Sequence, residues 1–259
     1  MATGVLILGV DGATRLLGHL ALKDKCYDAT IRLGSATVTD DAQGEIVSQA
    51  SAESVTKVHD DAITRGLSAL TGTISQRPSS VSAIKVDGKR AYARMRAGEE
   101  VELPAREVEI SEITIDGIRR SDGFIDVDVR VTCSSGTYIR AIARDLGDEL
   151  GVGGHLTALR RTRVGAFGVA ESVDVDHIAQ GFQTLDSVAA RSFRTIVVDA
   201  DMEQDIRHGR PMAWPVPGAS ESESESAVVH AFMSESGALL ALGERADSRL
   251  RYLAVFAHG

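Results

Sequence analysis

An arginine in the middle of the chain follows a predicted strand at a spacing suited to catalysis. Residues 125–133 alternate apolar and polar side chains, which is typical of a half-buried strand, and a Ser-Ser-Gly-Thr turn comes next. Apolar residues at helical spacing then predict a helix with Thr137 as its N-cap. Arg140 would lie in the first turn of this helix, held rigidly near the end of a sheet, which suits a catalytic side chain. The alternative is an ordinary surface arginine paired with Asp148.

Three further stretches carry polar and aromatic residues in a recognisable order. They are Lys25–Gly34 with Asp41–Gly44, then Gln76–Lys85 with Gly88–Tyr92, then Gly153–Thr162. Together with the segment around Arg140, they resemble the bacterial tRNA pseudouridine-55 synthases of the TruB type. The resemblance covers roughly residues 1–175, and four ordered motifs are hard to obtain by chance.

The resemblance implies an α+β protein with the pseudouridine synthase fold, in which helices flank a mixed, largely antiparallel sheet. The sequence pattern agrees, because its strands and helices do not alternate in a strict βαβ rhythm. We expect a catalytic domain over residues 1–190 and a small, mostly-β, PUA-like domain over residues 191–259. An acidic Ser/Glu run at residues 219–226 is too polar to fold alone and is predicted to be a loop.

Local patterns predict the elements that position these motifs. Residues 25–34 alternate as a strand, and residues 107–118 and 124–133 predict two more. Apolar residues from Val55 to Leu70 are spaced as one amphipathic helix that ends near Gly72. A short helix is expected over residues 91–97. Short strands are expected near residues 228–233, 238–242 and 253–256.

The resemblance also implies the reaction, which is the isomerisation of uridine 55 in the TΨC loop of tRNA to pseudouridine. The target base must leave the RNA stack before its glycosidic bond can be broken and remade through carbon 5. Arg140 matches the arginine that pairs with a nucleophilic aspartate. Tyr27 matches the tyrosine that stacks on the uracil and assists proton transfer. No cofactor or metal is needed.

The remaining matched positions imply contacts with the RNA. Tyr138 and Leu159 correspond to residues that line the uracil pocket, and four basic residues are expected to hold phosphates of the TΨC arm. These four are Lys25, Lys85, Arg160 and Arg161. Spacing alone favours simpler interpretations, with Tyr27 and Leu159 as core residues and each basic side chain as a solvated surface charge.

The family's nucleophile is not among the residues of this chain. It is the aspartate of a Gly-x-x-Asp-Pro-x-Ala-Thr-Gly-x-Leu loop, and the sequence Met1-Ala-Thr-Gly-Val-Leu6 joins that motif just after Asp-Pro. We expect a start codon placed too late rather than a truncated paralogue, and we expect the chain as given to be inactive. Arg140 would then lack its acidic partner. Alternatives are a non-catalytic tRNA-binding or tRNA-folding protein and a defunct fragment.

Composition limits the remaining classes. A net charge of −9 argues against a generic polyanion binder, although basic residues cluster at positions 85–96 and 160–163. No apolar run reaches membrane-spanning length, so we expect no contact with a membrane. We further expect a cytoplasmic protein that binds tRNA as a monomer. Cys26 and Cys133 are predicted to be buried, with a Cys133 nucleophile near His155 as the alternative. The scattered histidines and the lack of a Cys-x-x-Cys pair indicate no metal site.

Overall fold

The structure is a computed structural model that describes residues 2–79, 104–214, 216 and 228–256, and the backbone of residues 85–86 and 89–90. Contacts group these residues into two compact units. Unit 1 comprises Met1–Leu6 and Ala21–Glu171, and unit 2 comprises Ile7–Leu20 and Ser172–Gly259. Residues 172–190, which the sequence placed with the catalytic domain, therefore group with the carboxyl-terminal residues. No helix in the described parts of the chain is both long and apolar enough to cross a bilayer.

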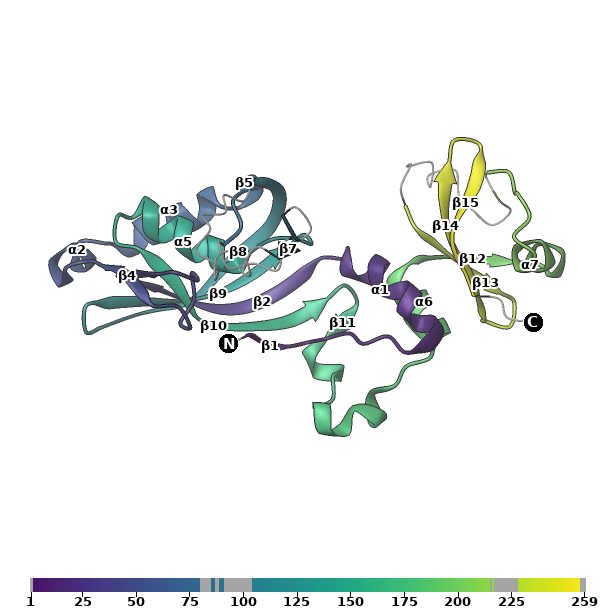
Figure 1. Cartoon of the computed structure of the whole chain (residues 1–259), viewed down its shortest axis with the longest axis horizontal. Coiled ribbons are helices and arrows are strands. Elements are labelled where there is room, and N and C mark those ends of the chain that lie inside the picture. The colour runs from purple at the N-terminus through teal and green to yellow at the C-terminus, as the bar shows by residue number, and fades with distance from the viewer. Residues whose placement is uncertain are drawn as a thin grey trace. The chain divides into compact units, whose positions relative to one another are not determined.

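Unit 1 is built on a mixed sheet in which β1 alone runs parallel to its neighbour and the other pairs are antiparallel (Figure 1). The predicted α+β class with a mixed, largely antiparallel sheet is thus confirmed. From one edge to the other the strands are β1 (Ala2–Gly4), β10 (Gly154–Val164), β2 (Lys25–Leu33), β9 (Phe124–Cys133), β8 (Arg106–Ser121) and β5 (Gly72–Gln76). A short strand outside this order, β11 (Phe167–Gly168), pairs with β10.

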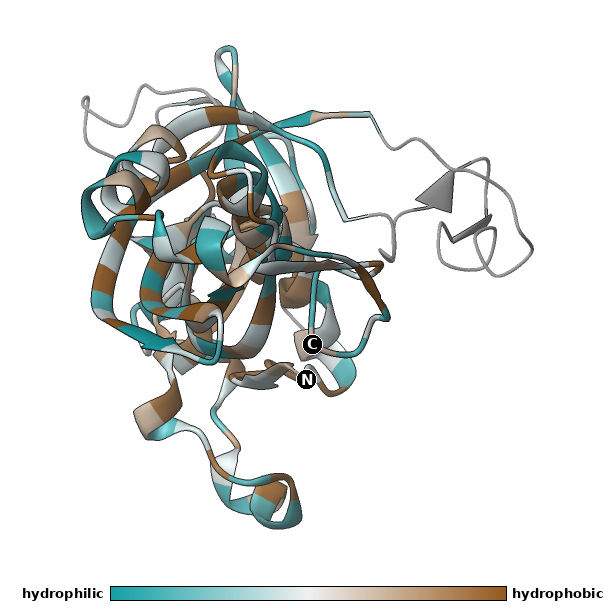
Figure 2. Cartoon of the chain, turned by 90° about the vertical axis from the view of Figure 1, so that its left-hand side faces the viewer, coloured by the Kyte–Doolittle hydropathy of each residue, from teal (hydrophilic) through white to brown (hydrophobic). Residues whose placement is uncertain are grey.

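One face of this sheet carries the core of unit 1. Hydrophobic and hydrophilic residues alternate along its strands (Figure 2), because successive side chains of a strand point to opposite faces. The apolar residues of β2 and β9 are fully buried beneath helices α3 (Asp60–Ala69) and α5 (Ile139–Glu149). The opposite face carries cross-strand ion pairs, including Arg32 with Asp126 and Arg130 with Asp28.

Two predicted helix boundaries are wrong. The stretch from Val55 to Leu70 forms two helices, α2 (Ala52–Thr56) and α3, because the backbone of His59 is extended and Asp60 and Asp61 begin a new helix, where acidic side chains are favoured. Helix α5 begins one residue later than expected. Its N-cap is Tyr138, while the Thr137 hydroxyl donates to the Ser134 carbonyl at 3.0 Å.

Smaller elements complete unit 1. Strand β3 (Ser35–Thr37) pairs with β4 (Ile46–Gln49), and the turn between them approaches β10. Strand β6 (Lys85–Val86) pairs with β7 (Lys89–Arg90). Two of the predictions, the helix over residues 91–97 and the acidic loop over 219–226, lie outside the described residues.

Unit 2 contains a second sheet in the order β12-β13-β14-β15, which agrees with the predicted mostly-β carboxyl-terminal part. Its core includes Trp214, Phe232 and Ile196. The amino-terminal helix α1 belongs largely to this unit, and its Arg15 lies over the ring of Phe256. The elements are α1 (Thr14–Ala21), α6 (Leu185–Ser192), β12 (Arg194–Val198), α7 (Ala200–Arg207), β13 (His230–Ser234), β14 (Leu239–Ala246) and β15 (Arg249–Val255), with 3-10 turns at Asp11–Ala13 and Val175–Gly181; a third, Val169–Glu171, belongs to unit 1.

Candidate active site

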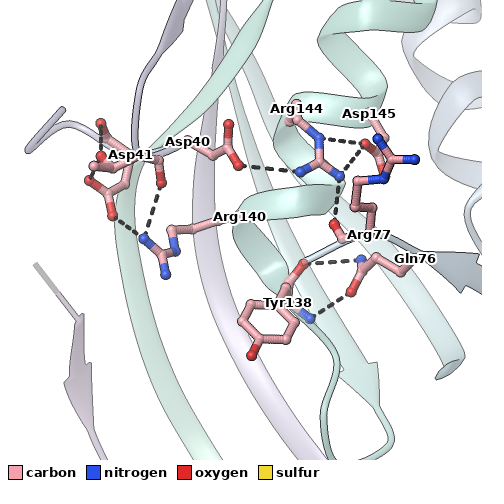
Figure 3. Close-up of polar contacts among 9 residues, drawn as sticks. Asp40, Asp41, Gln76, Arg77, Tyr138, Arg140, Arg144 and Asp145 are labelled. Atoms are coloured by element: carbon pink, nitrogen blue, oxygen red, sulfur yellow. Dashed lines mark hydrogen bonds and ion pairs between the residues drawn. The ribbon is translucent and has the colours of Figure 1, made fainter. Parts of the chain in front are cut away.

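Helix α5 brings Arg140 to a carboxylate that the sequence did not single out. The Arg140 Nη1 donates to Asp41 Oδ2 at 3.0 Å and to the Thr39 carbonyl at 3.1 Å (Figure 3). The two side chains are 23% and 9% exposed, so the pair is largely shielded from water. Two expectations are therefore wrong: Arg140 does not lack an acidic partner, and its partner is Asp41 rather than Asp148, about 12 Å further along the helix.

The turn between β3 and β4 holds Asp41 in place. Asp41 Oδ1 accepts hydrogen bonds from Thr39 Oγ1 at 2.6 Å and from the Gln43 amide at 3.0 Å, which leaves Oδ2 for Arg140. A Cβ at Gly44 would lie 2.5 Å from Thr39 Oγ1 and 2.7 Å from its amide nitrogen, so this tight turn requires glycine. The Asp-Ala-Gln-Gly motif was noticed in the sequence, but its acidic residue received no role there.

Backbone bonds attach the same turn to strand β10. The Leu156 amide donates to the Asp40 carbonyl at 3.0 Å, and the Ala42 amide donates to the Leu156 carbonyl at 2.8 Å. Asp41 forms a parallel bridge with Leu156. The acidic turn is thus fixed three residues from Leu159, one of the predicted pocket residues.

Strand register places Tyr27, Leu159 and Arg161 on one face of the sheet. Tyr27 pairs with Arg161, and Leu159 pairs with Ala29, so all three side chains share the face that carries the core. Burial raises the pKa of the Tyr27 hydroxyl, and a hydrogen bond with Arg161 opposes that rise. Arg161 Nε also donates to the Val5 carbonyl at 2.8 Å, which ties it to the segment after β1.

The same register separates the two neighbouring arginines. Arg160 pairs with Asp28 on the opposite face of the sheet and is exposed. The structure therefore brings Arg161, but not Arg160, to the face that carries Tyr27.

Tyr138 is held by a buried glutamine at the end of β5. Its amide donates to Gln76 Oε1 at 2.8 Å, and its carbonyl accepts from Gln76 Nε2 at 3.1 Å (Figure 3). Gln76 is 2% exposed and takes both backbone groups of the residue that begins α5. The sequence placed Gln76 in a motif without assigning it this function, because only the fold brings β5 beside α5.

Lys25 makes local contacts. Its Nζ donates to the carbonyl of Ala21, the last residue of α1, at 2.5 Å and to that of Lys23 at 2.6 Å. Burial lowers the pKa of this ammonium. The side chain of Lys85 lies outside the described residues.

The alternative cysteine nucleophile is unfavourable. Cys133 is 1% exposed, and burial raises the pKa of its thiol to about 11, so the reactive thiolate is scarce at neutral pH. His155 Nδ1 is engaged with the Ser35 carbonyl at 3.0 Å. Among the described residues, no three His, Cys, Asp or Glu side chains are grouped so that they could hold a metal ion.

Comparisons with known proteins agree with this arrangement. A model of the TruB family pseudouridylate synthase N-terminal domain matches residues 1–139, and a model of the tRNA pseudouridylate synthase B C-terminal domain matches residues 140–202. The tRNA pseudouridine synthase B of Thermobifida fusca is 48% identical over 263 residues, which span 99% of this chain and 86% of that protein. The protein of that name from Cutibacterium acnes is 50% identical over 253 residues, or 96% of this chain and 82% of its own.

Solved structures share the fold at low identity. A chain of the Cbf5-Nop10-Gar1 complex is 22% identical, with a TM-score of 0.69, and the match covers 99% of this chain and 73% of that one. A chain of an H/ACA RNP bound to a substrate RNA containing 2'-deoxyuridine is 20% identical, with a TM-score of 0.65 over 96% and 71% of the two chains. Sequence and fold agree, and the chain belongs to the TruB family of pseudouridylate synthases.

Proposed function

We propose that the protein isomerises uridine 55 in the TΨC loop of tRNA to pseudouridine. The proposal depends on one observation. Arg140, in the first turn of α5, forms an ion pair with Asp41, and Asp41 bridges to the strand that carries Leu159. The relatives named tRNA pseudouridine synthase B support the substrate class. The protein would act on the TΨC arm as a cytoplasmic monomer.

The site supplies what the reaction requires of a protein without a cofactor. Arg140 can hold a nucleophilic carboxylate ionised and oriented, because its guanidinium presents several donors in a rigid plane. Tyr27 offers a ring for the flipped uracil, and stacking of a base on an aromatic side chain contributes about 1–3 kcal/mol. Leu159 and Tyr138 provide the apolar walls of the pocket.

The basic residues receive unequal support as phosphate ligands. Arg161 lies on the face of Tyr27, whereas Arg160 projects from the opposite face and the ammonium of Lys25 is engaged by two carbonyls. We therefore propose Arg161 as the phosphate ligand nearest the site. Lys85, Arg160 and Lys25 remain proposed contacts with more distant parts of the arm.

The test is tritium release from tRNA that contains 5-tritiated uridine. The protein is expressed from its gene together with any in-frame upstream codons that encode Gly-x-x-Asp-Pro, and release of about one tritium per tRNA is expected. A transcript with cytidine at position 55 should release none. Release that persists with this transcript, or no release by a protein that contains the motif aspartate, would overturn the proposal. The 259-residue chain is expected to bind tRNA in a salt-dependent manner.

A further inference from the structure

A second arginine lies one turn after Arg140 on α5 and contacts three segments of unit 1. Arg144 Nη1 forms an ion pair with Asp40 Oδ2 at 3.4 Å, and Nη2 donates to the Arg77 carbonyl at 2.8 Å. Its Nε donates to Asp145 Oδ1 on its own helix at 2.8 Å (Figure 3). Arg144 is 22% exposed, so these contacts are largely shielded from solvent.

We propose that Arg144 is a positioning residue for the reaction, which acts by holding the Asp40–Asp41 turn so that Asp41 aims Arg140. The inference rests on the proposed function and assigns a role to a residue whose bonds go to Asp40, Arg77 and Asp145. A residue with a merely stabilising role would affect the free energy of unfolding alone. In the proposed role, Arg144 also controls the orientation of the Arg140 guanidinium.

Asp40 is the link between the two arginines. Its backbone adopts the left-handed conformation at φ +56°, which is strained for a residue other than glycine. Asp40 is 8% exposed, and burial raises the pKa of its carboxyl, while a hydrogen bond with Ser79 and the charges of Arg144 and Arg140 act against that rise. A buried aspartate in this conformation persists where its surroundings hold it. The backbone of Asp40 is bonded to Thr37 and Leu156, and Arg144 adds an ion pair to its side chain.

The geometry of the helix explains the coupling. Residues four apart on a helix lie on the same side, so Arg140 and Arg144 face the turn together. Adjacent residues of the turn, Asp41 and Asp40, then take one arginine each. Releasing Asp40 from Arg144 would remove a side-chain hold on this turn, and a small shift of Asp40 would redirect the carboxylate of the adjacent Asp41.

The third contact extends the arrangement to the end of β5. Arg144 holds the Arg77 carbonyl, and the preceding residue, Gln76, holds both backbone groups of Tyr138. Two successive residues, Gln76 and Arg77, are therefore fixed to α5, the first at its N-cap and the second at its second turn. Loss of Arg144 would loosen this attachment as well as the acidic turn.

Kinetics of four variants, made in the protein that contains the motif aspartate, test the proposal. The variants are Arg144→Gln, Arg144→Lys, Asp40→Asn and the double variant with Arg144→Gln and Asp40→Asn. Because misplacement of a catalytic group by about 1 Å can cost roughly 100-fold in rate, Arg144→Gln should lower kcat by about 10- to 100-fold and change KM by less than about threefold. Arg144→Lys should recover part of kcat, since an ammonium can keep one of the contacts. The double variant should cost about as much as the worse single one, as expected for residues that act together.

The matched control is Arg32→Gln. Arg32 makes two bonds of 2.7 Å to Asp126 on the opposite face of the sheet, so the change removes an arginine ion pair of similar exposure away from the site. Its kcat should stay within about twofold of the unsubstituted protein. If Arg144→Gln and Arg32→Gln lower thermal stability equally and leave kcat per folded molecule alike, the positioning role is refuted.

A measurement that does not need activity separates this inference from the proposed function. In ¹⁵N-detected NMR of the full 259-residue chain, rotation of the Arg140 guanidinium should be hindered while Asp41 holds it. Arg144→Gln and Asp40→Asn should each speed that rotation, and Arg32→Gln should not. Unchanged rotation in both variants would refute the inference even if tritium is released. Faster rotation without any tritium release by the protein that contains the motif aspartate would support the inference and count against the proposed function.

Discussion

Replacing Gly147 by alanine would place a methyl group inside the backbone of the neighbouring segment. Gly147 lies in α5, where it packs against the start of β10, and a Cβ there would be 2.1 Å from the Gly154 nitrogen and 2.2 Å from the Gly153 carbonyl carbon. The amides of Val152 and Gly153 both donate to the Gly147 carbonyl at 3.0 Å. This close crossing sets the position of α5, and therefore of Arg140, relative to the strand that carries Leu159.

The magnitude follows from two opposing effects. Exchanging glycine for alanine within a helix is favourable by about 1 kcal/mol. Overpacking a well-packed interior typically costs about 1–3 kcal/mol, and the contacts here involve backbone atoms that cannot rotate away. We expect overpacking to prevail, with a net loss of up to about 2 kcal/mol in the free energy of unfolding. In an active protein, kcat should fall by about 10-fold or more, because α5 must move away from β10.

The assay combines urea denaturation, followed by far-ultraviolet circular dichroism, with hydrogen exchange of peptides from α5 and β10. Gly18→Ala is the matched control, because Gly18 is also helical and a Cβ there would meet nothing within 4 Å. That variant should be unchanged or more stable by up to about 1 kcal/mol. If Gly147→Ala gained stability as well, with normal protection of α5, the inferred close packing of α5 on β10 would be wrong.

Three further predictions concern the chemistry of the site. In the active protein, Arg140→Lys should lower kcat roughly 100-fold with little change in tRNA affinity, because a point charge cannot replace a planar set of donors; a near-normal rate would contradict this role. Asp41→Asn should lower the free energy of unfolding by about 1–2 kcal/mol in urea titrations, because the asparagine side chain presents a donor or a neutral acceptor to Arg140. Unchanged stability would show that the Arg140–Asp41 ion pair contributes little. With its pKa raised to about 11, Cys133 should resist a disulfide reagent at pH 8 until the protein unfolds, and rapid labelling of the native protein would refute the burial. The stability that the Cys133 thiol contributes below pH 9 should be lost as the pH rises towards 11.

Periodicity in the sequence identified two strands and the helix of the site, but it did not predict β10, which carries Leu159 and Arg161. Alternation over residues 25–33 and 124–133 identifies β2 and β9 and the face each buries, because the side chains of a strand alternate regardless of what lies beside it. Helical spacing after Cys133 places Arg140 in the first turn of α5 for the same local reason. The ordered motifs supplied the family, which the comparisons confirmed.

The partners of these residues were decided by the tertiary structure. Asp41 is 99 residues from Arg140 in the chain, and Gln76 is 62 residues from Tyr138, so no local pattern relates either pair. Their meeting depends on the left-handed backbone of Asp40, on the bridge from Asp41 to Leu156, and on the order of strands in the sheet. The direction of a side chain follows from its own few neighbours in sequence, whereas the group it meets depends on how distant segments pack.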